Sequence, residues 1–162
     1  INLLNEWLQK LVKASDPKEK KELLRRIVVV GAYLKRRNNL TLVNEQDGII
    51  KEEELQLSIQ EMMKNLQLAG IPCAASVQFE KDLPADVAMK FFDFYEQVVE
   101  YAFDGLHSLL ARFFCRDGCF YACVDAVCSL DMTALQSEKI SVSQPEADCY
   151  TISLKLEGGA GK

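Results

Sequence analysis

Apolar residues recur at helical spacing along the first third of the chain. In residues 1–13 they share one helical face: Leu3, Leu4, Trp7, Leu8, Leu11 and Val12. The triplet Ser15-Asp16-Pro17 then favours a new start, because Asp16 can cap a helix and Pro17 suits its first position. A second stripe follows and predicts a long helix: Leu23, Ile27, Val30, Leu34, Asn38, and Thr41 or Leu42. Gly31 lies inside this helix, where the lack of a side chain allows another helix to approach closely.

The middle of the chain predicts two more helices around a short strand. Residues 44–51, with Asp47-Gly48, are typical of a loop. Residues 52–69 predict a helix that Gly70 and Pro72 end. Its inward positions are Leu55, Ile59, Met62, Met63 and Leu66. Residues 73–79 predict a strand, Leu83-Pro84 a turn, and residues 86–103 a helix whose apolar residues occupy more than one face, so that it is deeply buried.

The last third changes to a strand pattern. Residues 109–115 and 119–127 are apolar and rich in strand formers, and Arg116-Asp117-Gly118 between them indicates a tight hairpin. Residues 130–137 predict a short linker or helical turn. Residues 140–143 and 149–156 predict a final strand pair around Pro145, and residues 158–162 a flexible end.

This order predicts an α+β fold, a two-layer sandwich of a mixed, mostly antiparallel sheet with helices on one face, preceded by a helical hairpin. The expected division is a dimerisation-like hairpin at 1–48, the sandwich at 49–157 and a tail at 158–162. No parallel strand–helix–strand alternation and no Gly-rich loop after a strand is evident, which excludes Rossmann and P-loop nucleotide enzymes.

Composition limits the classes of partner. The net charge of −5 argues against non-specific nucleic-acid binding. The longest apolar run, residues 27–34, is far shorter than the ~20 residues of a membrane span, and no signal peptide is evident. We expect no membrane contact within this chain and a cytoplasmic location, alone or as the soluble part of a membrane-anchored protein. The basic run Lys35-Arg36-Arg37 is interpreted as a solvated helix face.

The six cysteines are too sparse for a disulfide scaffold, and several lie in apolar runs, so reduced thiols are expected. The spacing of Cys115, Cys119, Cys123 and Cys128 does not match structural zinc sites. A cysteine-based redox enzyme would need an exposed thiol of low pKa, and the sequence contains no Cys-x-x-Cys motif to supply one.

From residue 55 to residue 156, the order of helices and strands resembles the ATPase domain of sensor histidine kinases, the GHKL or Bergerat fold. The matching pieces are the helix at 55–70, the strand at 73–79, the helix at 87–105, the hairpin at 109–127 and the closing pair at 141–156. The first two helices resemble the dimerisation hairpin that precedes that domain. Residues 24–40 resemble this helix in kinase-like proteins of Gram-positive anaerobes, which usually carry a transmembrane sensor region upstream.

The resemblance implies site residues that this chain only partly keeps. In the family's Glu-x-x-x-Asn motif, the glutamate handles water or a proton and the asparagine binds Mg²⁺; here Glu96 and Glu100 stand at these positions. Spacing of four places both on one helix face, and a carboxylate is itself a Mg²⁺ ligand. Glu96 is thus the candidate catalytic residue and Glu100 the candidate metal ligand; a polar edge left by a decayed site is the alternative.

Other parts of the family pattern are lost. Asp125 matches the aspartate that holds adenine, but Val127 and Ser129 fill the two glycine positions of Asp-x-Gly-x-Gly. The stretch from Ser129 to Ser141 has no glycine and no room for the phosphate-holding lid helix. Residues 1–50 contain no phosphoacceptor histidine, and His107 is interpreted as a helix-end or turn residue.

The sequence therefore favours a histidine-kinase-like signalling module of a bacterial two-component type, a pseudokinase without ATP binding or phosphotransfer and without a cofactor. A homodimer through the N-terminal helices and a signalling protein partner are expected, with Asn38 setting the register of the bundle. One alternative is a divergent histidine kinase that binds ATP and Mg²⁺ through Glu96, Glu100 and Asp125. A further alternative is a non-enzymatic α+β scaffold domain.

Overall fold

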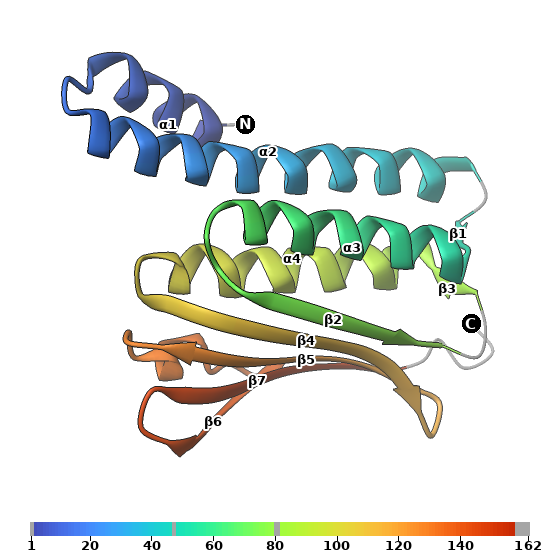
Figure 1. Cartoon of the computed structure of the whole chain (residues 1–162). Coiled ribbons are helices and arrows are strands. Elements are labelled where there is room, and N and C mark those ends of the chain that lie inside the picture. Colours follow the sequence, from blue (N-terminus) through green and yellow to red (C-terminus); the bar gives the residue numbers. More distant parts are fainter. Residues whose placement is uncertain (1, 47, 80–81, 158–162) are drawn as a thin grey trace.

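The chain folds in three layers (Figure 1). A computed structural model describes residues 2–46, 48–79 and 82–157. The hairpin of α1 (Asn2–Lys13) and α2 (Pro17–Gln46) forms one outer layer, α3 (Glu52–Leu68) and α4 (Ala85–Ala102) the middle layer, and a five-stranded sheet the other outer layer. The predicted sandwich is therefore confirmed, and the hairpin lies against its helices as an additional layer.

The main sheet is mixed, with one parallel pair. Its strands are β2 (Cys73–Gln78), β4 (Leu106–Arg116), β5 (Cys119–Cys128), β6 (Ile140–Glu146) and β7 (Cys149–Glu157), in the order β2-β4-β5-β7-β6. Only β2 and β4 are parallel, and the three other pairs are antiparallel. A small second sheet joins β1 (Ile49–Ile50) to β3 (Leu83–Pro84). Two short 3-10 helices, η1 (Phe103–Gly105) and η2 (Met132–Leu135), precede β4 and β6.

Local sequence signals set several of the boundaries. The Asp16 carboxylate accepts a hydrogen bond from the Lys18 backbone N–H at 3.0 Å, at the start of α2. Gly70 adopts a φ of 89° after α3, which a side chain would strain. Asp117 and Gly118 both have positive φ, 51° and 76°, as a two-residue turn between right-handed twisted strands requires.

The core lies between α4 and the sheet. Phe91 of α4 packs against Phe79 and Phe113, with ring centroids 6.2 and 5.6 Å away. Along β5, buried Ala122, Val124 and Ala126 alternate with partly exposed residues, since successive side chains point to opposite sheet faces. One face of the sheet is thus covered by helices and the other is open.

The structure corrects three local predictions and leaves a fourth untested. Residues 44–46 continue α2 and residues 49–50 form β1, so the predicted loop at 44–51 is wrong over most of its length. Asp47 lies outside the described residues. Leu83-Pro84 is a short strand instead of a turn, because these two residues pair with Ile50 and Ile49 of β1, a partner distant in sequence. His107 is the exposed second residue of β4 instead of a helix end. The predicted tail at 158–162 lies outside the described residues.

The second half of the predicted seam on α2 is not buried in this chain. Asn38 and Leu42 are exposed, and a Cβ built on Gly31 meets no atom within 4 Å. The close helix approach that Gly31 allows is therefore not used by the described residues. No helix among the described ranges is long and apolar enough to cross a membrane.

Candidate functional site

The face of α4 that points away from the sheet is polar. It carries Asp93, Glu96, Gln97 and Glu100, spaced by three or four residues, so all four lie on one side of the helix. Val30, Tyr33 and Leu34 of α2 lie opposite, and a cavity of about 310 Å³ remains between the two helices. The predicted pair Glu96 and Glu100 is therefore on one face, as expected, but that face is partly covered by α2.

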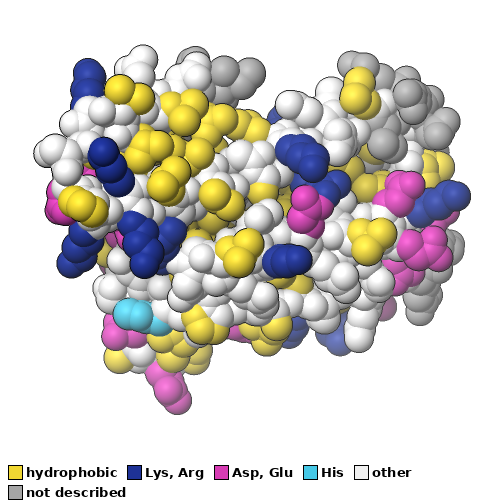
Figure 2. Space-filling model, turned by 45° about the horizontal axis from the view of Figure 1, so that its top comes forward, with side chains coloured by type: hydrophobic (Ala, Val, Ile, Leu, Met, Phe, Trp, Pro, Cys, Tyr) yellow, Lys and Arg dark blue, Asp and Glu magenta, His cyan; other side chains and the backbone are white. Residues whose placement is uncertain are grey.

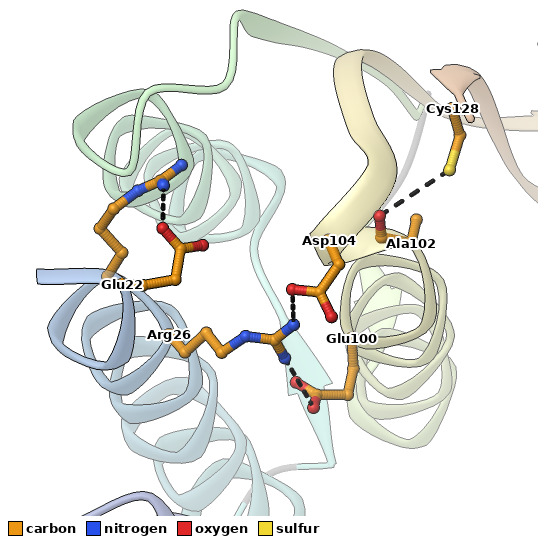
Figure 3. A network of polar contacts seen from close by, with 7 residues as sticks. Glu22, Arg26, Glu100, Ala102, Asp104 and Cys128 are labelled. Carbon is orange, nitrogen blue, oxygen red and sulfur yellow. Dashed lines mark hydrogen bonds and ion pairs between the residues drawn. The ribbon is translucent and has the colours of Figure 1, made fainter. Parts of the chain in front are cut away.

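Arg26 of α2 occupies one end of this interface and is 8% exposed. Its guanidinium hydrogen-bonds the Asp104 carboxylate, and its Nη1 lies 3.7 Å from Glu100 Oε1 (Figure 3). The rings of Trp7 and Phe103 lie 4.8 and 4.7 Å from the guanidinium carbon. The charge is thus compensated by carboxylates and aromatic faces, as a buried arginine requires. Glu100, the candidate metal ligand, is held by this cation.

Asp93 forms the second polar contact between α2 and α4. Its Oδ1 accepts hydrogen bonds from Tyr33 Oη at 2.6 Å and from Arg37 Nε at 2.9 Å. Burial, followed by the Asp93 hydrogen bond, raises the pKa of Tyr33, and the same carboxylate raises the pKa of Arg37. Both groups keep their protons at neutral pH, so this contact persists there.

The basic run of α2 is part of the interface. Arg36 forms an ion pair with Glu61 of α3, and Lys35 Nζ lies 3.9 Å from the same carboxylate. With Arg37 bound to Asp93, the interpretation of this run as a solvated face is wrong for Arg36 and Arg37. The cause is tertiary packing, because Glu61 of α3 and Asp93 of α4 lie opposite the basic residues of α2.

Glu96 lies in the middle of this interface. Its Oε2 is buried and has no hydrogen-bond partner. Burial, followed by the nearby Glu100 and Asp93 carboxylates, raises the pKa of Glu96 to about 8. At neutral pH the carboxyl is therefore mostly protonated, which suits a general acid or a neutral interface group better than a metal ligand.

Asp125 lies on the other side of the sheet. It alternates with the buried Val124 and Ala126, so it points to the open face, away from α4. Its Oδ2 accepts from Arg112 Nη2 at 3.0 Å, and its Oδ1 accepts from Thr151 Oγ1 at 2.7 Å. A shallow cavity of about 450 Å³ lies beside it on this face. The structure therefore brings Glu96 and Glu100 together but not Asp125.

The segment where the sequence resemblance implies a lid is short. Between β5 and β6 the chain forms η2, which begins where the Asp131 carboxylate accepts from the Thr133 N–H at 3.0 Å. Met132 and Leu135, the first and last residues of η2, are buried. Ser129 Oγ lies 3.4 Å from the Gly105 carbonyl oxygen, so this position packs against η1. All of residues 129–139 are described, and they contain no longer helix than η2.

Sequence reasoning missed Arg26, Tyr33, Arg37 and Asp93, which form most of the polar contacts of this interface. A signal was present: acidic positions 93, 96 and 100 of one helix match basic positions 26 and 37 of another. Pairing them requires knowing that the two helices are neighbours, which the sequence pattern did not show.

Neither a protein-family model nor a curated protein matches the chain by sequence. Solved structures match it over most of its length. A bacterial phosphotransferase covers 93% of this chain and 85% of its own at 11% identity, with a TM-score of 0.50. The match to the histidine kinase AdeS of Acinetobacter baumannii covers 98% of this chain and 94% of the AdeS chain at 10% identity, with a TM-score of 0.48. The match to the histidine kinase domain of the blue-light activated kinase of Erythrobacter litoralis covers 96% of this chain and 95% of that domain at 10% identity, with a TM-score of 0.47.

These identities support a shared fold alone. The α+β fold with a preceding helical hairpin agrees with the fold that the sequence predicts, and the bacterial phosphotransferase shares it.

Proposed function

We propose that this chain is a histidine-kinase-like signalling module that works through protein contacts, without ATP binding or phosphotransfer. The observation that carries the proposal is the separation of the three expected nucleotide-site residues. Glu96 and Glu100 face α2, whereas Asp125 faces the open side of the sheet.

The contacts of these residues support the proposal. An adenine nucleotide with Mg²⁺ needs an adenine acceptor and metal ligands that reach one molecule. Both oxygens of Asp125 already accept hydrogen bonds from Arg112 and Thr151. Glu100 faces Arg26, and α2 lies over Glu96. Using this site would require the α2 contacts to break and a ligand to span the sheet.

Phosphotransfer lacks its usual residue in the same region. Residues 1–50 contain no histidine, and the single histidine, His107, lies exposed at the start of β4. None of the side-chain hydrogen bonds of the described residues engages its imidazole, so no base or orienting carboxylate accompanies it.

Calorimetric titration with a non-hydrolysable ATP analogue and Mg²⁺ tests the proposal directly. We expect no saturable heat up to millimolar nucleotide for the wild-type chain, with far-UV circular dichroism confirming that it is folded. A saturable heat that disappears in Asp125→Ala or Glu100→Gln would overturn the proposal. That result would favour the divergent kinase, with ATP and Mg²⁺ as its cofactors.

We also propose that the partner of the hairpin is a second copy of this chain. Apolar side chains gather over α1 and α2 on the face in Figure 2. The exposed apolar residues of the hairpin include Leu8 and Val12 of α1 and Leu24 and Val28 of α2. Two such hairpins would bury these residues in a four-helix bundle, with the exposed Asn38 available to set its register. The module would then be a cytoplasmic dimer that presents its remaining surface to a signalling protein.

Light scattering at high micromolar concentration tests the dimer. We expect a dimer for the wild type and a monomer for Val28→Lys. Leu57→Lys is the matched control, since Leu57 is 66% exposed on α3, outside the hairpin. A monomeric wild type would overturn the proposed dimer. If Leu57→Lys abolished the dimer as fully as Val28→Lys, dimerisation would not be specific to the hairpin. Either result favours the simple scaffold domain.

A further inference from the structure

The interface between α2 and α4 contains a carboxyl group that no neighbour satisfies. Glu96 Oε2 is buried without a hydrogen-bond partner, beside a cavity of about 310 Å³. Burying an ionised carboxylate in this way is costly unless a cation or donors compensate it. The position is therefore compatible with a neutral carboxyl and poorly compatible with a charged one.

The charged neighbours of Glu96 do not change this. On α4 itself, Asp93 and Glu100 are both carboxylates that repel a charge at Glu96. On α2, Arg26 pairs with Glu100 and Asp104, and Arg37 pairs with Asp93.

Tyr33, also on α2, donates its hydroxyl hydrogen to Asp93, and the other α2 residues at the cavity, Val30 and Leu34, are apolar. The cations of α2 that face this region are thus already occupied. A deprotonated Glu96 would meet two negative charges and no cation of its own.

The hairpin is attached to the sandwich differently from the way the sandwich holds itself together. Its polar contacts to α3 and α4 are Arg26, Arg36, Arg37 and Tyr33 with their carboxylates. The aromatic core between α4 and the sheet lies on the other side of α4. The hairpin also buries Val29 and Leu40 of α2 against the core, but it takes no part in these aromatic contacts, so its separation leaves them closed.

We propose that Glu96 is a proton-controlled latch: its protonated carboxyl lets the hairpin dock on α4, and loss of the proton releases α2 and exposes the acidic face of α4. The latch is a property of this interface and does not depend on which partner the module binds.

Linkage gives the direction and size of the effect. The pKa of Glu96 is raised from 4.5 to about 8 in the docked state, so docking is favoured at low pH and weakens as pH rises toward 8. If the pKa returns to its ordinary value on release, the docking constant falls about 30-fold between pH 6.5 and pH 9.

Hydrogen exchange of the full chain, read by mass spectrometry at pH 6.5 and pH 9 and normalised to intrinsic exchange rates, tests the latch. The informative peptides cover α2 and α4, and β5 peptides report the sandwich. In the wild type we expect protection of α2 to fall by about 30-fold while β5 changes little. Glu96→Gln keeps the size of the side chain without the titration and should show no such fall.

A control substitution separates the latch from a general charge effect. Asp86→Asn removes an exposed carboxylate from the first turn of α4 and should behave as the wild type. Constant α2 protection in the wild type, an equal fall in Glu96→Gln, or a parallel fall in β5 would each overturn the proposal. The last outcome would mean that pH opens the whole fold instead of the hairpin contact.

Discussion

The two faces of α4 hold their neighbours by different physics. Toward the sheet, Phe91 is 1% exposed and packs between Phe79 and Phe113. Toward α2, the same helix presents Asp93 and Glu100 to a tyrosine and two arginines. The first face removes apolar area from water, and the second adds charge pairs across a partly open cavity to the burial of α2 side chains such as Val30.

This difference teaches where the molecule can change shape. Apolar contacts contain no charge to be screened and no group that titrates, whereas ion pairs weaken with ionic strength and with titration of their members. The sheet and α4 should therefore behave as one rigid unit, and the hairpin as the part that conditions can move.

The largest expected effect lies in the core. Phe91→Ala leaves a cavity among Phe79, Phe113 and α4 and should lower the free energy of unfolding by about 3–5 kcal/mol. Urea denaturation followed by circular dichroism measures it. Phe114→Ala is the matched control, because Phe114 lies half-buried on the open sheet face against Tyr121. Equal losses in both variants would break the distinction between the covered and the open face.

A smaller effect is expected at the hairpin interface. Arg26→Met keeps an unbranched apolar stem but leaves Glu100 and Asp104 without their cation. Since both carboxylates keep access to water, we expect a loss of about 1–3 kcal/mol in hairpin protection. Hydrogen exchange should place the loss in α2 and not in β5. Lys20→Met, an exposed position of the same helix, should cost under about 0.5 kcal/mol.

Substitutions at Gly105 and Gly31 should have effects of opposite sign. A Cβ on Gly105 would lie 2.6 Å from Ser129 Oγ and 3.1 Å from the Leu130 backbone N, so Gly105→Ala should destabilise by about 1–3 kcal/mol. A Cβ on Gly31 meets nothing, so Gly31→Ala should stabilise α2 by up to about 1 kcal/mol. Thermal melts of both variants measure this. Destabilisation by Gly31→Ala would show that another helix approaches α2 there in solution.

Much of the architecture was predictable from local signals. Helical spacing located α1, α3 and α4, and Asp117-Gly118 located the β4–β5 hairpin, because period and turn chemistry act over neighbouring residues. The loop predicted at residues 44–51 was wrong, since no nearby residue signals that α2 continues to Gln46 and that β1 finds its partner in β3.

The sequence by itself determined the order of the main helices and strands and the shared face of Glu96 and Glu100. Only the tertiary structure decided that Asp125 faces away from them, because a strand's neighbours set which of its two faces is covered. It also decided that Arg26 and Arg37 pair with carboxylates instead of facing solvent. These pairs join residues far apart in the chain, and their formation depends on how the hairpin packs against the sandwich.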